Sequence, residues 1–136
     1  MSCPHKQYAQ DLMENDKIRH VLLRIGVALI FVSFGIWEIV QPSYWIAFVP
    51  KPIAQMVSPS LFINLHGLLL LIIGLGILTG TYLRISAMLA VLVMISIIAS
   101  LWYESGFSDI IIRDMVVLIA ALALVFDDTN YLRLRK

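Results

Sequence analysis

The chain has 136 residues, of which 60% are hydrophobic and 14% charged, whereas soluble globular domains carry roughly 25% charged residues. A net charge of +1 does not indicate binding to nucleic acid, and a single cysteine, Cys3, excludes an intramolecular disulfide and a Cys-x-x-Cys redox pair. This composition predicts one integral membrane domain.

The first apolar run covers residues 21–40 and follows a polar N-terminal segment, residues 1–20. No small-residue cleavage site follows the run, so we expect it to stay as a membrane span and not to be removed as a signal peptide. In the loop at residues 41–60, prolines disfavour helix, while Tyr44, Trp45 and Phe48 supply aromatic rings. This loop is expected to lie in the outer membrane interface, with its rings at headgroup depth.

Three more apolar runs follow, at residues 61–79, 85–103 and 110–126. Each is close to the ~20 residues that cross ~30 Å of hydrocarbon as a helix, and the alternating pattern of barrel strands is absent. The short connections TGTYLR and YESGFS predict an all-α, integral membrane, up-down-up-down four-helix bundle. Small residues at spacings of three, four and seven are interpreted as sites of close helix packing: Gly67, Gly74, Gly76, Gly80, Ser86, Ala90, Ser96 and Ser100.

The lysines and arginines predict the orientation of this bundle in the cell membrane. The two loops on the outer side together carry only Lys51, whereas the N-terminal flank, the turn before the third run and the tail, residues 127–136, are basic. The positive-inside rule therefore places both termini in the cytoplasm. Arg24 and Arg84, at span boundaries, are interpreted as anchors that reach the headgroups. The basic residues on the cytoplasmic side are Lys6, Lys17, Arg19, Arg24, Arg84, Arg133, Arg135 and Lys136.

Five ionisable residues are predicted to lie at one depth in the outer leaflet. Glu38 ends the first span, His66 lies early in the second, Glu104 ends the third, and Arg113 and Asp114 lie in the fourth. The fourth span covers only ~18 Å if it begins after Asp114 and ~25 Å if it begins at Ile110. Both charges are therefore expected below the hydrocarbon boundary. An unpaired charge there costs at least ~2.5–3.5 kcal/mol, which predicts a partner for each.

The partners of the last two charges can be narrowed by helix geometry. Neighbouring helical residues point ~100° apart, so Arg113 and Asp114 are not expected to pair with each other. Asp109, four residues before Arg113, can reach it along one face, whereas the partner of Asp114 must come from another helix, a loop or a ligand.

Each residue also has a purely structural interpretation. Asp109, next to Ser108, suits the start of a helix, and Arg113 can reach outward to the headgroups or bridge to a carboxylate of another span. His66 can be a hydrogen-bonded packing residue, and Glu104 can lie in the membrane interface. No metal site is predicted, because the histidine and carboxylates lack the spacing of a recognisable one.

Several segments resemble the DoxX-like four-helix membrane proteins. They are LLRIGVALIFVSFGIWEIVQPSYWIAFVP, LIIGLGILTGTYLR and, most specifically, DIIIRDMVVLIAALAL with its Arg113-Asp114 dipeptide. The resemblance runs from about residue 22 to 126. Members of the family commonly have a lysine where this chain has Glu38 and a glutamate where it has His66. The resemblance implies membrane redox chemistry, because the namesake relatives belong with thiosulfate:quinone oxidoreductase subunits, while many others have no established activity.

Two functions remain open. In the first, the protein is a small membrane subunit of an oxidoreductase, in which Arg113 and Glu104 bind a quinone headgroup or an anionic substrate and Asp114, Glu38 and His66 move protons. Because the sequence has no redox-cofactor motif, electrons would pass through bound quinone or through another membrane or redox subunit. In the second, the charges fix helix register, and the protein is a scaffold or assembly factor for another membrane complex. The expected partners are the lipid bilayer and other membrane or redox subunits, or further copies of the chain as a homo-oligomer. A transporter is disfavoured, since no span is interrupted by proline.

Overall fold

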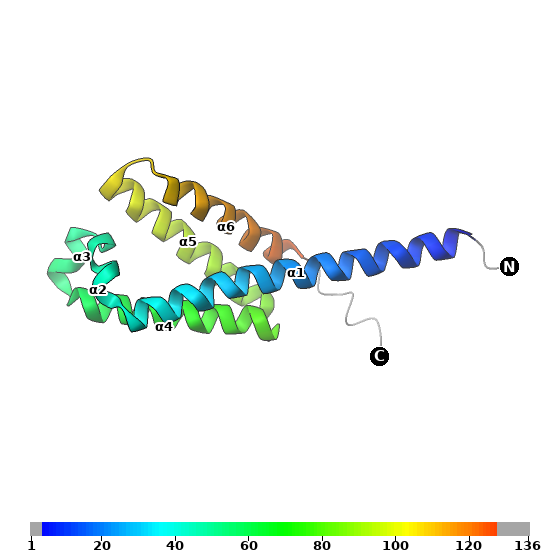
Figure 1. The fold of residues 1–136 in the computed structure, drawn as a ribbon, viewed down its shortest axis with the longest axis horizontal. Helices are drawn as coiled ribbons and strands as arrows, with labels where there is room; N and C mark the ends of the chain where they lie inside the picture. Colours follow the sequence, from blue (N-terminus) through cyan, green and yellow to red (C-terminus); the bar gives the residue numbers. More distant parts are fainter. Residues whose placement is uncertain (1–3, 128–136) are drawn as a thin grey trace.

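A computed structural model describes residues 4–127 of the chain, and within this range it is entirely helical (Figure 1). Four long helices make up most of it, and three short helical segments connect the first two of them. The long helices are α1 (Pro4–Val40), α4 (Pro59–Thr79), α5 (Leu83–Ser105) and α6 (Asp109–Phe126); the short ones are α2 (Pro42–Trp45), the 3-10 helix η1 (Ile46–Phe48) and α3 (Lys51–Met56). Cys3 and the basic residues of the tail lie outside the described residues.

Three of the long helices are long and apolar enough to cross a membrane: α1 from Gln10, α4 and α5. Helix α6 has 18 residues, which span about 27 Å, and it carries Asp109, Arg113 and Asp114 in its first two turns. The helices α4, α5 and α6 contain the apolar runs read from the sequence. The chain is therefore an integral membrane protein.

Helix α1 is longer than the first apolar run, because it continues back through the polar segment. Its 37 residues correspond to about 56 Å. Figure 1 shows its N-terminal part extending beyond the ends of the other long helices. Between Pro4 and Gly26 the sequence contains neither proline nor glycine, so no residue interrupts the helix there. From Pro4 onward, the polar segment thus continues the helix of the first span.

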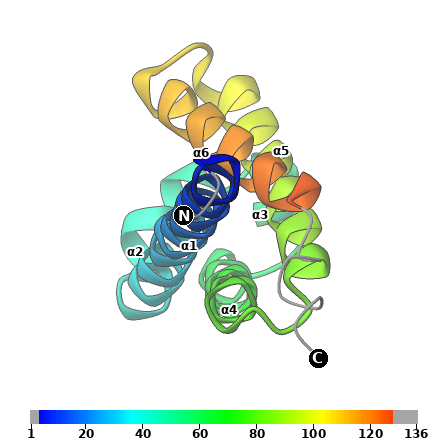
Figure 2. The ribbon, with the colours of Figure 1, turned by 90° about the vertical axis from the view of Figure 1, so that its right-hand side faces the viewer.

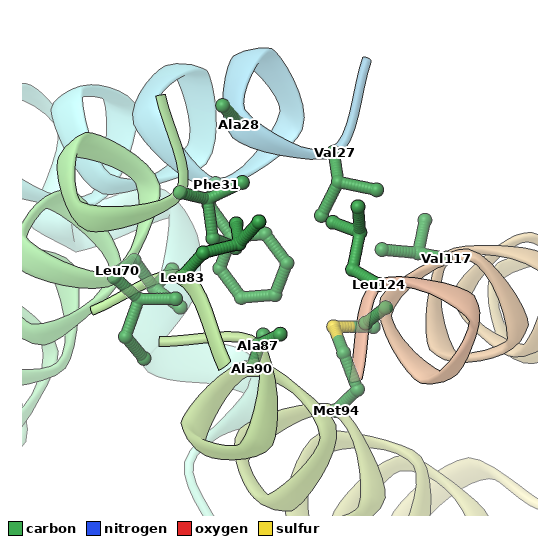
Figure 3. Packing of buried hydrophobic residues seen from close by; sticks show 13 residues of the cluster. Val27, Ala28, Phe31, Leu70, Leu83, Ala87, Ala90, Met94, Val117 and Leu124 are labelled. Atoms are coloured by element: carbon green, nitrogen blue, oxygen red, sulfur yellow. The ribbon is translucent and has the colours of Figure 1, made fainter. Parts of the chain in front are cut away.

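The long helices run alternately in opposite directions, with α1 lying along α4 and α5 along α6 (Figures 1 and 2). All four contribute to one hydrophobic core, in which Phe31 of α1 is almost fully buried (Figure 3). The core lies on the N-terminal side of Phe31 in α1 and in the C-terminal parts of α4 and α6. The opposite end of the bundle is covered by α2, η1 and α3, and it is there that the predicted site residues lie. The core residues are Val27, Ala28, Phe31, Leu70, Ile73, Ile77, Leu83, Ala87, Ala90, Met94, Val117, Ala121 and Leu124.

Glycines allow the backbones of α1 and α4 to approach closely. A Cβ added to Gly35 would lie 2.7 Å from the carbonyl oxygen of Gly67, and one added to Gly67 would lie 2.9 Å from the carbonyl oxygen of Gly35. Two turns further along α4, a Cβ on Gly74 would lie 2.9 Å from the backbone nitrogen of Val32. At Gly67 and Gly74 the small residues therefore do serve close helix packing, as the sequence predicts.

Replacing Gly67 with alanine should lower the free energy of unfolding by about 1–3 kcal/mol, because the new methyl group meets backbone that cannot move aside. Gly26 offers a matched control in α1, since a Cβ there has no atom within 4 Å. Gly26→Ala should leave stability unchanged or raise it slightly through helix propensity. Thermal unfolding of the two variants in detergent measures the difference, and equal melting curves would contradict the close contact.

The middle of α1 is held to the ends of α4 and α6 by two polar contacts. Arg24 donates from Nη2 to the carbonyl oxygen of Leu78 at 3.2 Å, near the C-terminus of α4. His20 pairs with Asp127, directly after α6. Arg24, interpreted from the sequence as a headgroup anchor, thus also interacts with the negative end of a helix dipole.

Candidate functional site

A cavity of about 310 Å³ lies at the end of the bundle that α2, η1 and α3 cover. Its walls come from all four long helices and are mostly apolar. Four of the five ionisable residues singled out in the sequence line it: Glu38 of α1, His66 of α4, and Arg113 and Asp114 of α6. Cavities of a few hundred Å³ with apolar walls and a few polar groups are typical of small-molecule sites in proteins.

Glu38 and His66 form a hydrogen-bonded pair across the α1–α4 interface. Nδ1 of His66 lies 2.7 Å from Oε2 of Glu38, and Glu38 is only 5% exposed. The glycine contacts described above make this possible, because Gly67 follows His66 and a Cβ on it would lie 3.0 Å from Cβ of Glu38. The ring of Phe62, one turn before His66, stacks on the imidazole at a centroid distance of 6.3 Å. Backbone proximity and stacking together fix the imidazole beside the carboxylate.

Arg113 and Asp114 bond to each other, contrary to the expectation from the sequence. Nε and Nη2 of Arg113 lie 3.0 and 2.9 Å from Oδ1 of Asp114. The ~100° between neighbouring residues describes the directions of their Cα–Cβ bonds, whereas the long arginine side chain can fold back toward the adjacent carboxylate. Asp114 is 5% exposed, and the Arg113 side chain is 52% exposed. The partner of the buried carboxylate is therefore local.

Asp109 does not take the role expected for it as the partner of Arg113. Within residues 4–127, its side chain forms neither an ion pair nor a hydrogen bond, although it lies in the first turn of α6, where its charge complements the helix dipole. Ser108 is the N-cap residue in an extended conformation, and its side chain makes no capping hydrogen bond. The start of α6 thus has the predicted position but lacks the predicted side-chain cap.

Phe34 lies near one residue of each hydrogen-bonded pair. The guanidinium carbon of Arg113 lies 5.1 Å from the centre of the Phe34 ring, a cation-π distance, and Phe34 is one helical turn before Glu38. Phe34 also lines the cavity. The residues of both pairs therefore line the same cavity.

Glu104 lies outside the cavity. At the end of α5, its carboxylate accepts a hydrogen bond of 3.4 Å from the backbone N–H of Lys51. This contact joins the start of α3 to the end of α5. Glu104 therefore has a structural contact of its own and is not among the residues that the cavity brings together.

The aromatic residues of the loop form a roof over the cavity. Trp45 packs edge-on against Phe34, Trp37 and Tyr44 at centroid distances of 5.6, 5.4 and 5.3 Å, and Phe48 lies 5.9 Å away. All five rings line the cavity. Nε1 of Trp45 is buried and makes no hydrogen bond to the described residues, so ring packing alone holds Trp45 in place.

Sequence reasoning placed the loop rings in the membrane interface and did not assign them to a site. It also did not single out Phe34 and Trp37 of α1, and it interpreted Ser96 and Ser100 of α5 only as helix-packing residues, whereas all four line the cavity. One signal was available for α1: Phe34, Trp37 and Glu38 have the i, i+3, i+4 spacing of a single helix face. Among the described residues, no three histidine, cysteine or carboxylate side chains are grouped as metal ligands.

The fold and the cavity define an integral membrane protein with a polar site enclosed between its helices. A protein-family model described as DoxX matches residues 20–103. The chain therefore belongs to the DoxX family. The match includes Glu38, His66 and the aromatic roof, and it ends before Arg113 and Asp114. No curated protein and no solved structure matches the chain.

Proposed function

We propose that the protein crosses the cell membrane four times, with both termini in the cytoplasm, and binds the headgroup of a quinone in the cavity. The alternating directions of the long helices and the one-sided distribution of lysine and arginine support this topology. Helix α6, at about 27 Å, is long enough to serve as a fourth span with modest thinning of the bilayer. The cavity then lies in the outer leaflet, at a depth that a quinone headgroup can reach from the lipid.

One observation carries the ligand assignment: two hydrogen-bonded pairs of ionisable side chains line a single, mostly apolar cavity covered by aromatic rings. Ring stacking suits a flat conjugated headgroup, and the polar groups suit its oxygen atoms. Half-exposed Arg113 can donate to a carbonyl oxygen, while Glu38, His66 and Asp114 can accept or return protons. The residues thus supply binding and proton transfer.

Electron transfer requires a partner in this proposal. The sequence carries no redox-cofactor motif and no thiol pair, so quinone would be the redox group, and another membrane or redox subunit would exchange electrons with it. The protein is then a small membrane subunit of a quinone-linked oxidoreductase, associated with that subunit or with further copies of itself.

A scaffold or assembly role is the second candidate, and one observation favours it. Each charged pair is satisfied within the chain, Glu38 by His66 and Asp114 by Arg113. Buried ion pairs of this kind can specify helix register without binding a ligand. Ligand binding separates the two candidates.

The test is binding of duroquinone to the purified protein in detergent, since its fully substituted ring cannot add to Cys3. Wild type should bind saturably, and Asp114→Asn should fold but bind about tenfold more weakly, because the neutral amide no longer holds Arg113 in place through a charge-assisted bond. Asp109→Asn is the matched control, on the same helix but outside the cavity. Absence of saturable binding by wild type, or loss of folded protein in Asp114→Asn, would favour the scaffold.

A further inference from the structure

The residues that line the cavity include hydrogen-bond acceptors without a partner among the described residues. Oε2 of Glu38 and Oδ1 of Asp114 are used by their partners, but the other oxygen of each carboxylate makes no hydrogen bond to the described residues. Nε2 of His66 is likewise unbonded within the described part of the chain. Nε1 of Trp45 is fully buried and has no hydrogen-bond partner among the described residues, but none of these three acceptor atoms is buried in this way. A ligand therefore meets three free acceptor atoms.

The Glu38 carboxylate determines which ring nitrogen of His66 carries the proton and which carries a free lone pair. A carboxylate only accepts hydrogen bonds, so in the neutral imidazole the proton resides on Nδ1 and is donated to Oε2 over 2.7 Å. Nε2 then carries the lone pair. Burial of Glu38, at 5% exposure, and stacking of Phe62 keep this arrangement fixed.

Among the charged residues that line the cavity, Arg113 is the donor to a ligand. Nε and Nη2 of Arg113 are bonded to Asp114, which leaves its remaining guanidinium N–H groups for the ligand. A quinone has only acceptor oxygens, so it can be bonded by Arg113 but by none of the three free acceptors. A hydroquinone has two hydroxyl groups, each able both to donate and to accept. The reduced ligand therefore matches the cavity better than the oxidised one.

We propose that the cavity binds the hydroquinone form in preference to the quinone, with Nε2 of His66 accepting a hydrogen bond from a ligand hydroxyl and Glu38 acting as the positioning residue. This inference rests on the proposed function and specifies the redox state that the site selects. It requires no electron transfer by the chain. Preferential binding of the reduced form also makes bound ligand harder to oxidise than free ligand.

The experiment compares durohydroquinone and duroquinone binding to full-length protein in detergent, under anaerobic conditions at pH 8. Wild type should bind durohydroquinone about tenfold more tightly, because a site that hydrogen-bonds a hydroxyl discriminates against the analogue that lacks it. A tenfold preference raises the midpoint potential of the bound two-electron couple by about 30 mV, which a redox titration measures independently.

Three variants locate the preference. His66→Lys retains a donor to Glu38 but has no hydrogen-bond acceptor, and it should lose the preference for the reduced form. Glu38→Leu combined with His66→Leu removes the pair without leaving a buried charge, and it should also bind both forms equally. Asp109→Asn, outside the cavity, should keep the tenfold ratio. A purely structural pair would change stability and leave this ratio unaltered.

Failures of the two proposals are distinguishable. If wild type binds both forms with equal affinity, the preference is overturned while the quinone site stands. If His66→Lys keeps the tenfold ratio, His66 is not the acceptor and the inference is likewise overturned. If wild type binds neither form saturably, the proposed function itself is wrong and the inference falls with it.

Discussion

Replacing His66 with leucine is expected to lower the free energy of unfolding by about 3–5 kcal/mol, because it leaves the Glu38 carboxylate buried without its partner. The carboxylate is 5% exposed, and its contact to His66 is the one hydrogen bond that it makes within residues 4–127. Neither the apolar cavity walls nor the membrane can solvate the charge that remains. The loss should be visible as a large decrease in melting temperature and in the yield of folded protein.

A second substitution in the same protein distinguishes loss of the Glu38–His66 pair from loss of side-chain packing. Adding Glu38→Leu to His66→Leu should recover most of the stability, since replacing a whole buried ion pair with apolar residues is often neutral or stabilising. A double variant as unstable as His66→Leu alone would show that the imidazole contributes through packing against Phe62, 6.3 Å away, and not through the carboxylate.

Sequence periodicity and span length were sufficient for the helical class and for the segments that contain the long helices. They could not give the length of α1, because the polar residues before the first apolar run carry no membrane signal and the helix continues through them only for lack of a breaker. Nor could they describe the loop, where prolines begin the short helices α2 and α3. Those elements depend on how the aromatic rings pack against α1.

The sequence predicted which ionisable residues lie together in the candidate site, but it did not predict how Arg113 and Asp114 bond. Counting residues inward from the outer end of each span placed Glu38, His66, Arg113 and Asp114 at one depth, and the structure brings all four to one cavity. Depth alone does not separate Glu104 from them, because its position depends on rotation about the α5 axis and on the loop near Lys51. The Arg113–Asp114 bond depends on side-chain torsions, which helix periodicity does not describe.

Glu38 and His66 are the two positions at which the sequence departs from the residues that the resemblance to DoxX-like proteins implies, and they are in contact. Nδ1 of His66 lies 2.7 Å from Oε2 of Glu38. The pair therefore supplies complementary hydrogen-bonding groups across the α1–α4 interface.

Replacing Arg113 with methionine should destabilise the protein by about 3–5 kcal/mol, since Asp114 would remain as a buried charge with no partner among the described residues. Methionine retains part of the arginine stem and its packing near Phe34, so the effect reports the charge. Thermal unfolding in detergent measures it. Asp109→Asn, which removes a charge from the exposed first turn of the same helix, should change stability by less than about 1 kcal/mol.

Combining Arg113→Met with Asp114→Asn removes both charges, so the protein should regain most of its stability. It should nevertheless bind duroquinone about 10- to 100-fold more weakly, because the donor to the ligand carbonyl is lost and a charge-assisted hydrogen bond contributes about 1.5–3 kcal/mol. A stable double variant with wild-type affinity would instead mean that the Arg113–Asp114 pair only fixes helix register. The separation of stability from affinity in this one variant therefore decides between a ligand-binding subunit and a scaffold.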